Sequence, residues 1–309
     1  MKRKLVKQGA ATMMISLPSK WIRKNELNKG DEIDLEERDG NILLRTSSVL
    51  KHKKEVILEI TPENKDDFKN LVLHAYKRGA DRVIIRGVNR ESLKVIQKIS
   101  RRLLGFELTD QEGDTVILES LTEPADGTFN IMIKKIFLVF QDQIDDIIED
   151  FTSGKYENEK ENEDSYFNGD RLIQFCRRIL TKSSRTQSSV LQWGFVTTLS
   201  MVHNEIDYMY KYGLENKLKV ESKTINLLKE YKENYLSLLY EIYINKRIED
   251  IHKIRKLSYQ YQYGKCYELL ENSKGKQSVI LAFVREIFKL TYWGRTSIYS
   301  DVMDKMIKG

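Results

Sequence analysis

The chain has 309 residues, of which 40% are hydrophobic and 32% are charged. This length and composition suffice for two or three domains with cores of their own. No run of about 18 apolar residues occurs, so no membrane insertion is expected, and the basic N-terminus lacks the apolar segment of a secretory signal. The two cysteines, Cys176 and Cys266, form no CxxC pair. The sequence therefore predicts a protein without a disulfide framework and indicates the cytoplasm.

Positive charge is concentrated at the N-terminus. Residues 1–54 contain 13 Lys or Arg and 7 acidic residues, a net charge of +6, which equals the net charge of the whole chain. The remaining residues therefore sum to zero. Because attraction to nucleic-acid phosphates depends on clustered Lys and Arg, we expect this segment to contact DNA. The residues expected to make that contact are Arg3, Lys4, Lys7, Lys20, Arg23 and Lys24.

Residues 1–46 are typical of a small β-rich module. Thr12–Leu17 is predicted to be a strand, and Pro18 suits the first turn of a short helix. Glu32–Glu37 alternates acidic and apolar residues like a half-buried strand, and Asp39-Gly40 predicts a hairpin turn before a return strand. A unit this small buries too little surface alone and is expected to need a partner subunit.

This order of features resembles the SpoVT-AbrB, or MazE-like, swapped-hairpin domain over residues 3–46. The features that carry the resemblance are Gly9, Leu17-Pro18, Trp21, Leu27, Gly30-Asp31 and Asp39-Gly40. The resemblance implies that residues 1–48 form a swapped-hairpin β-barrel in a homodimer and bind DNA through their basic face. The alternative is a dimerisation module whose basic face is only solvated.

Residues 54–122 predict a second domain of the α+β type. Glu55–Ile60 and Arg82–Arg86 are expected strands, Pro62–Arg78 and Arg90–Leu104 show the apolar spacing of helices, and two further strands follow. The order βαβαββ is expected to give a ferredoxin-like sandwich. No catalytic motif or phosphate-cradling loop occurs, so the role is either structural or ligand-sensing.

Residues 126–309 are predicted to be a helical bundle. Apolar residues recur at helical spacing over Phe129–Phe151, and the acidic stretch 152–164 is expected to be a loop. Five more helices are predicted, and the boundary between the third and fourth of them, near Lys246, is either a true end or a kink. Their expected ranges are about 165–182, 187–214, 222–246, 248–271 and 277–307.

Six helices in two sets of three behind such an N-terminal domain resemble the archaeal PhoU-like phosphate uptake regulators, in domain order over the whole chain. Relatives of this family hold iron or zinc clusters through ExxxD-like motifs, but each motif here lacks at least one carboxylate. The residues found where acids are expected are Tyr166, Asn204, Tyr208 and Arg295. We therefore expect no cofactor and no metal cluster. The acids that remain as candidate ligands are Asp170, Glu205, Asp207 and Glu286.

Two functions follow from these patterns. The first is a multidomain α+β transcriptional regulator that binds DNA and controls phosphate uptake. The alternative is a regulatory scaffold that does not bind DNA and docks a phosphate transporter component, or another protein, through its helical domain. An enzyme is not expected, because no nucleophile–base pair is evident. His203 is expected to be a packed or surface side chain and not a ligand.

Overall fold

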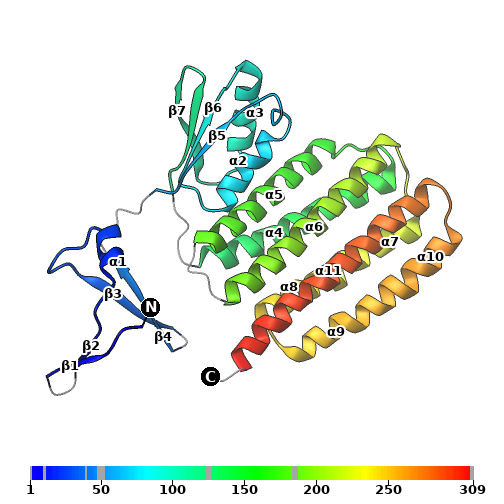
Figure 1. Cartoon of the computed structure of the whole chain (residues 1–309). Coiled ribbons are helices and arrows are strands. Elements are labelled where there is room, and N and C mark those ends of the chain that lie inside the picture. The colour runs from blue at the N-terminus through cyan, green and yellow to red at the C-terminus, as the bar shows by residue number, and fades with distance from the viewer. Residues whose placement is uncertain are drawn as a thin grey trace. The chain divides into compact units, whose positions relative to one another are not determined.

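A computed structural model describes residues 2–9, 12–38, 40–46, 53–122, 127–182 and 187–306. The chain divides into two compact units, one ending at Lys53 and one beginning at Lys54. The first contains strands and one short helix, and the second combines a small sheet with long helices (Figure 1). Within the described ranges, no helix is both long and apolar enough to cross a membrane.

The N-terminal unit consists of two β-hairpins with a short helix between them in the chain. Its elements are β1 (Val6–Gln8), β2 (Thr12–Met14), α1 (Ser19–Lys24), β3 (Ile33–Arg38) and β4 (Asn41–Thr46). β1 pairs antiparallel with β2, and β3 with β4, as two separate sheets. One chain thus supplies two separate hairpins. The swapped-hairpin barrel implied by the resemblance needs strands from a second chain, so it stays a prediction. Asp39, half of the predicted turn, lies outside the described residues.

The second unit begins with an α+β lobe. Its elements are β5 (Glu55–Glu59), α2 (Phe68–Lys77), β6 (Arg82–Arg86), α3 (Arg90–Ser100), β7 (Phe106–Glu112) and β8 (Thr115–Ser120). The predicted element order is confirmed, but the ferredoxin-like assignment is wrong, because that fold has the order βαββαβ. Here the sheet order is β5-β6-β8-β7, and β5 lies parallel to β6. The parallel neighbours β5 and β6 are joined by a crossover through α2, as parallel strands require. The hairpin of the lobe, β7–β8, comes last in the chain.

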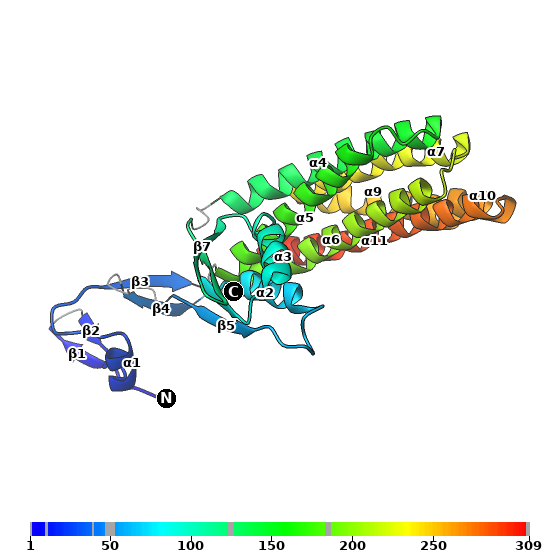
Figure 2. The same ribbon diagram turned by 90° about the horizontal axis from the view of Figure 1, so that it is seen from above.

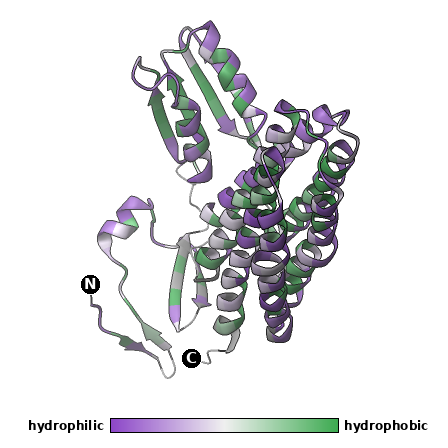
Figure 3. Ribbon diagram, turned by 90° about the vertical axis from the view of Figure 1, so that its right-hand side faces the viewer, coloured by the Kyte–Doolittle hydropathy of each residue, from purple (hydrophilic) through white to green (hydrophobic). Residues whose placement is uncertain are grey.

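The lobe has one apolar layer between its sheet and its helices. Alternate residues of β6 and β8, such as Val83, Ile85 and Val116, are buried against α2 and α3, to which Tyr76 and Ile96 belong. α3 is capped at Asn89, whose side chain accepts hydrogen bonds from the first turn. Figure 3 shows hydrophobic residues along the strands of this sheet.

The remainder of the second unit is a bundle whose helices share one apolar core. Its elements are α4 (Thr128–Ser153), α5 (Glu159–Lys182), α6 (Gln187–Glu215), α7 (Ser222–Glu230), η1 (Tyr231–Leu236), α8 (Ser237–Asn245), α9 (Ile248–Tyr259), η2 (Gln260–Lys265), α10 (Cys266–Asn272) and α11 (Lys276–Met306). η1 and η2 are π-helical turns that leave α7–α8 and α9–α10 continuous. The described part of the bundle therefore contains six helical segments, with bounds close to those predicted. α6 and α11 lie side by side (Figures 1 and 2).

The acidic stretch between the first two bundle helices differs from the prediction. Residues 152–164 were expected to form a loop, but α5 already begins at Glu159. Buried Asp150 organises the turn, because its carboxylate accepts hydrogen bonds from the Tyr210 hydroxyl (2.7 Å) and the Asn158 backbone N–H (3.2 Å). Acidic residues in the first helical turn also interact favourably with the helix dipole. The boundary near Lys246 is a true end, since that residue has a φ of 53°.

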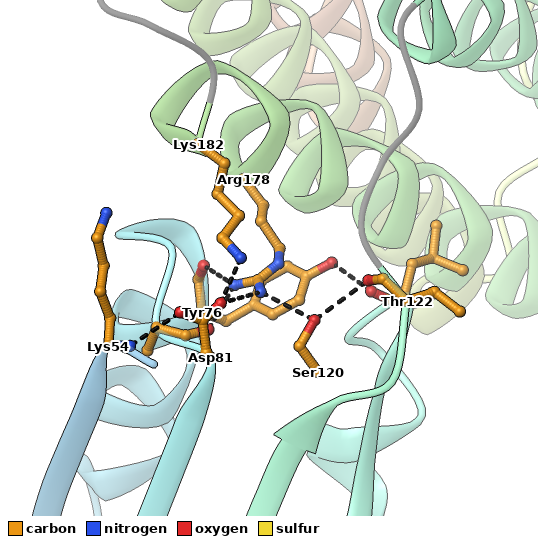
Figure 4. Close-up of polar contacts among 9 residues, drawn as sticks. Lys54, Tyr76, Asp81, Ser120, Thr122, Arg178 and Lys182 are labelled. Carbon is orange, nitrogen blue, oxygen red and sulfur yellow. Dashed lines mark hydrogen bonds and ion pairs between the residues drawn. The ribbon is translucent and has the colours of Figure 1, made fainter. Parts of the chain in front are cut away.

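A buried arginine joins the lobe to the bundle. The Arg178 side chain extends from α5 and is fully buried. Its guanidinium donates to the backbone oxygens of Ala80 (2.7 Å) and Tyr76 (3.1 Å) and to the Ser120 hydroxyl (3.0 Å), as Figure 4 shows. It also lies over the rings of Tyr76 and Phe106, at 4.9 and 5.1 Å from their centroids. One side chain of the bundle thus bonds to three separate points of the lobe.

Asp81 supplies the negative charge beside this arginine. Its carboxylate lies 3.8 Å from the Arg178 guanidinium and bonds to Lys182, one helical turn further along α5 (Figure 4). Burial alone would raise the pKa of Asp81, but hydrogen bonds from Lys182 and the Lys54 backbone N–H, together with the two nearby cations, lower it. The carboxylate is therefore ionised near neutral pH and offsets part of the cost of burying Arg178.

Replacing Arg178 with Met should lower the free energy of unfolding by about 3 kcal/mol, because it leaves buried acceptors without their donor. Urea unfolding, followed by circular dichroism, measures this. The matched control is Arg255→Met on the exposed side of α9, which should change the same quantity by less than about 0.5 kcal/mol. Equal effects of the two substitutions would show that Arg178 does not hold the lobe.

Candidate nucleic-acid interface

The six cations predicted to contact DNA all lie on the surface of the N-terminal unit. Arg3 and Lys4 precede β1, Lys7 lies within it, and the other three belong to α1. Each is exposed. Within the described part of the chain none of the six forms an ion pair or a side-chain hydrogen bond, so these charges remain available to a partner.

The helix α1 presents its cations on one side. Lys20, Arg23 and Lys24 have the i, i+3, i+4 spacing that places residues on a common face. Trp21 and Ile22 fall on the other side and are partly buried. Arg23 and Lys24 also lie in the last turn, where positive charge is favourable beside the helix dipole. The apolar pair therefore orients α1 with its basic face toward solvent.

Charge is segregated along the unit. Residues 2–29 contain eight Lys or Arg and one acidic residue, Glu26, whereas residues 31–39 contain six acidic residues. The first of these, Asp31, accepts a hydrogen bond from the Asn28 backbone N–H (2.7 Å). Segregation of this kind leaves the eight cations of the basic segment with one carboxylate of that segment to offset them. Such a surface attracts phosphate groups without reading base sequence.

The same unit leaves its apolar side chains uncovered. None of its described residues is buried. Leu35 is 69% exposed and Ile42 is 71% exposed, and the pairing of β3 with β4 places both on one face with Ile33 and Leu44. Figure 3 shows hydrophobic segments in these strands. The unit therefore lacks a core of its own. Because an isolated two-stranded hairpin is only marginally stable in water, these hairpins need additional apolar contacts.

Comparison with known proteins identifies this unit. Residues 6–51 match a family model described as antidote-toxin recognition MazE, bacterial antitoxin. The match includes Lys7, Lys20, Arg23 and Lys24, and it begins after Arg3 and Lys4. A MazE/AbrB-like domain fits a DNA-binding regulator or an antitoxin-like role. No curated protein and no solved structure matches the chain, and the family match does not extend to the lobe or the bundle.

The acids considered as metal ligands are engaged by cations or amides of the chain. Asp170 accepts a hydrogen bond from Gln174 (2.7 Å) and lies 3.9 Å from the Arg102 guanidinium. Asp207 accepts a hydrogen bond from Lys211 (2.7 Å). A carboxylate compensated in this way is a poor ligand for a hard cation, which needs several free oxygens.

The remaining two acids lie on neighbouring helices, α6 and α11. Burial and the charge of Glu286 together raise the pKa of Glu205. Glu286 itself bonds to Lys289 (3.0 Å). Across the described ranges, no three His, Cys, Asp or Glu side chains are grouped so that they could hold a metal ion. The four candidates therefore do not form one site.

His203 is packed, which is one of the two positions that the sequence left open. Its ring stacks between Tyr166 and Phe140, with centroids 4.7 and 5.1 Å away. Gly169 makes room for it, because a Cβ at that position would lie 2.4 Å from the His203 Nε2. Among the residues that the structure describes, Nε2 has no hydrogen-bond partner. Burial lowers the pKa of His203 to about 3, so the folded protein keeps this imidazole neutral.

This lowered pKa predicts a pH dependence of stability. Below about pH 6.5 the unfolded chain protonates His203, whereas the folded chain does so only near pH 3. Stability should therefore fall by about 1.4 kcal/mol per pH unit through this interval. His203→Phe puts a C–H where Nε2 lies and should flatten the acid side of the stability curve by that slope. Urea unfolding at several pH values tests this, with His252→Phe, at an exposed histidine, as control. Parallel curves for His203→Phe and the unchanged protein would contradict it.

Proposed function

We propose that this protein is a DNA-binding regulator that acts as a dimer through its N-terminal unit. The observation that supports the proposal is a group of six exposed cations that have no ion partner among the described residues, in a unit that matches the MazE family model. Phosphate contacts by such cations give affinity, and side chains at base edges give sequence preference. The proposal assigns the protein no catalytic step.

Dimerisation follows from the missing core. Each hairpin exposes large apolar residues, including Val6 and Met13 in the first and Leu35 and Ile42 in the second. Burying one such side chain contributes about 1.5–3 kcal/mol. A second copy supplies matching strands in a symmetric, isologous interface, the commonest arrangement of soluble homo-oligomers. In this proposal the dimer also brings two basic faces together, which doubles the number of phosphate contacts.

The double substitution Leu35→Asp/Ile42→Asp in the full chain should convert the dimer to a monomer at micromolar concentration, because four carboxylates would have to enter the dimer interface. Sedimentation velocity measures the change. Gln8→Asp adds a charge at a position that is already polar and should leave the dimer intact. Helical circular dichroism should persist in every variant, since the second unit has a separate core. A double variant that remained dimeric would refute this interface.

Removing charge from α1 should weaken DNA binding. Arg23→Ala/Lys24→Ala is expected to reduce the slope of log K against log salt by roughly 0.9 for each lost phosphate contact. The adjacent pair Arg255-Lys256 on α9 offers a matched control with the same residue types and the same loss of charge. Fluorescence anisotropy with duplex DNA at several salt concentrations gives both slopes. Equal slopes for the two variants would mean that DNA is bound elsewhere or only through net charge. The variant Arg3→Ala/Lys4→Ala/Lys7→Ala separates the N-terminal segment from α1.

We propose further that the regulated genes serve phosphate uptake. The support is the order of parts: a MazE-like unit, an α+β lobe and six helical segments, as in the PhoU-like regulators that the sequence resembles. Sequencing the DNA fragments crosslinked to the unchanged protein, with Arg23→Ala/Lys24→Ala as background, tests the target. Fragments next to phosphate transporter genes would support this part. Specific fragments elsewhere would refute it while leaving DNA binding intact.

An exposed aromatic row favours a second function, the docking of a protein partner through the bundle. Tyr259, Tyr263 and Tyr267 are 56%, 53% and 41% exposed, and Arg285 lies over the last two rings. Tyrosine and arginine are enriched in protein interfaces. The salt titration separates the two functions, because a scaffold that does not bind DNA would show no salt-dependent affinity for the duplex.

A further inference from the structure

A line of cations runs along α3 of the lobe. Arg90, Lys94, Lys98 and Arg102 follow one another at intervals of four residues, which places them on one side of the helix and its C-terminal turn. Like charges at this spacing destabilise a helix by about 0.2–0.5 kcal/mol per pair. The one acidic residue of the helix, Glu91, lies in its first turn. The line of charge therefore does not serve the stability of α3, and its presence calls for another explanation.

Three of these cations surround a hollow together with a lysine of α2. We name the hollow the basic pocket: its rim is Lys69, Lys94, Lys98 and Arg102, and its floor is Val95 and Ile99. Its volume is about 420 Å³, within the usual range of about 300–1,000 Å³ for small-molecule sites. Four of the six lining residues are cationic and none is acidic, so the hollow has one sign of charge.

Two other hollows of the second unit show how unusual this composition is. One, beside α4 and α5, includes Asp142 among its cations. The other, between α7 and α10, contains Glu230 and Glu268, and the Glu230 carboxylate bonds to Lys265 (2.6 Å). Both hollows thus contain acidic as well as basic residues. The lining of the basic pocket contains no carboxylate, and of its four cations Arg102 lies near one outside the lining, Asp170 (3.9 Å). Residues 55–309 as a whole have no net charge.

The rim cations are available to a ligand. Lys69, Lys94 and Lys98 are exposed and form no hydrogen bond or ion pair with another described residue. Two residues of α5 position the Arg102 side chain: its guanidinium lies 5.5 Å from the centroid of the Phe167 ring and 3.9 Å from the Asp170 carboxylate. The pocket thus combines three uncommitted ammonium groups with one positioned guanidinium.

We propose that the basic pocket binds a small molecule with two or more linked phosphate groups, the class that includes inorganic tripolyphosphate and nucleoside triphosphates. From Lys94 to Arg102 the chain advances eight residues, or about 12 Å along a helix. One phosphate group cannot meet all of these cations, whereas linked phosphates reach several of them. The apolar floor accommodates the uncharged body of such a ligand, and the concave shape favours a compact molecule over an extended duplex. This site lies outside the N-terminal unit and does not depend on the proposed DNA binding.

Isothermal titration calorimetry of the full chain with tripolyphosphate and with ATP tests the proposal, at roughly 0.1 M salt, where distant charges are screened. The unchanged protein should bind at least one of these probes. Lys94→Ala/Lys98→Ala should raise the dissociation constant by roughly tenfold or more, since it removes two charge-assisted contacts. Arg255→Ala/Lys256→Ala removes the same charge from an exposed face of α9 and should leave the constant within about twofold. Lys94→Arg/Lys98→Arg should retain binding, because the charge stays.

Stability and DNA binding provide the remaining readouts. Ala at positions 94 and 98 removes like-charge repulsion and is a good helix former, so the thermal midpoint should not fall. A lower midpoint would mean that these lysines support the fold and would overturn the proposal. The proposal would also be overturned if the unchanged protein bound neither probe, or if Arg255→Ala/Lys256→Ala weakened probe binding as much as Lys94→Ala/Lys98→Ala. If Lys94→Ala/Lys98→Ala left the probes unaffected but weakened binding to duplex DNA, the pocket would instead be part of a nucleic-acid track. The variant Arg23→Ala/Lys24→Ala should lose affinity for DNA and retain its affinity for tripolyphosphate and ATP. This variant therefore separates failure of the basic pocket from failure of the N-terminal interface.

Discussion

The placement of the lobe on the bundle depends on the burial of one positive charge. A guanidinium removed from water is costly unless its donors are satisfied and its charge is offset. Arg178 meets these conditions only where Tyr76, Ala80 and Ser120 present oxygens to it and Asp81 lies nearby. These acceptors belong to α2, to the turn between α2 and β6, and to the end of β8. A shift of the lobe along α5 would break all of these bonds at once, so the interaction selects one arrangement.

The N-terminal unit obeys a different constraint. The lobe and the bundle each bury aromatic and aliphatic side chains within one chain, whereas residues 2–46 bury none of those described. Hydrophobic burial is the dominant favourable contribution to folding, so these hairpins depend on apolar surface from outside their own chain. In the proposed dimer, folding of the N-terminal unit and assembly are therefore one event, and the DNA-binding face exists only in the assembled state.

Much of this architecture follows from periodicity. The bundle helices were predictable because their apolar residues recur at helical spacing for many turns, as in Phe129–Phe151, and the second hairpin because Gly40 permits a positive φ. The start of α5 was not predictable, since Asp150 organises that turn through Tyr210, 60 residues away. The sheet order was also missed, because strand patterns give the number of strands but not their neighbours. The burial of Arg178 has only a weak signal in the sequence, namely a cation that lies among the apolar residues of an amphipathic helix.

Of the candidate sites, the N-terminal cations were predictable from composition alone, because their excess is visible in the net charge of the first 54 residues. The basic pocket was not found in this way. Residues 55–309 sum to zero, and that sum hides a local imbalance in which Lys94, Lys98 and Arg102 line one hollow that has no acidic residue in its lining. The sequence does contain cations at intervals of four residues along α3, but the apolar residues of the same helix are the ones that predict its packing. Charge acts on a ligand over about a Debye length, some 10 Å at moderate salt. The relevant quantity is therefore the charge within one patch, and a neutral domain is fully compatible with a strongly basic site.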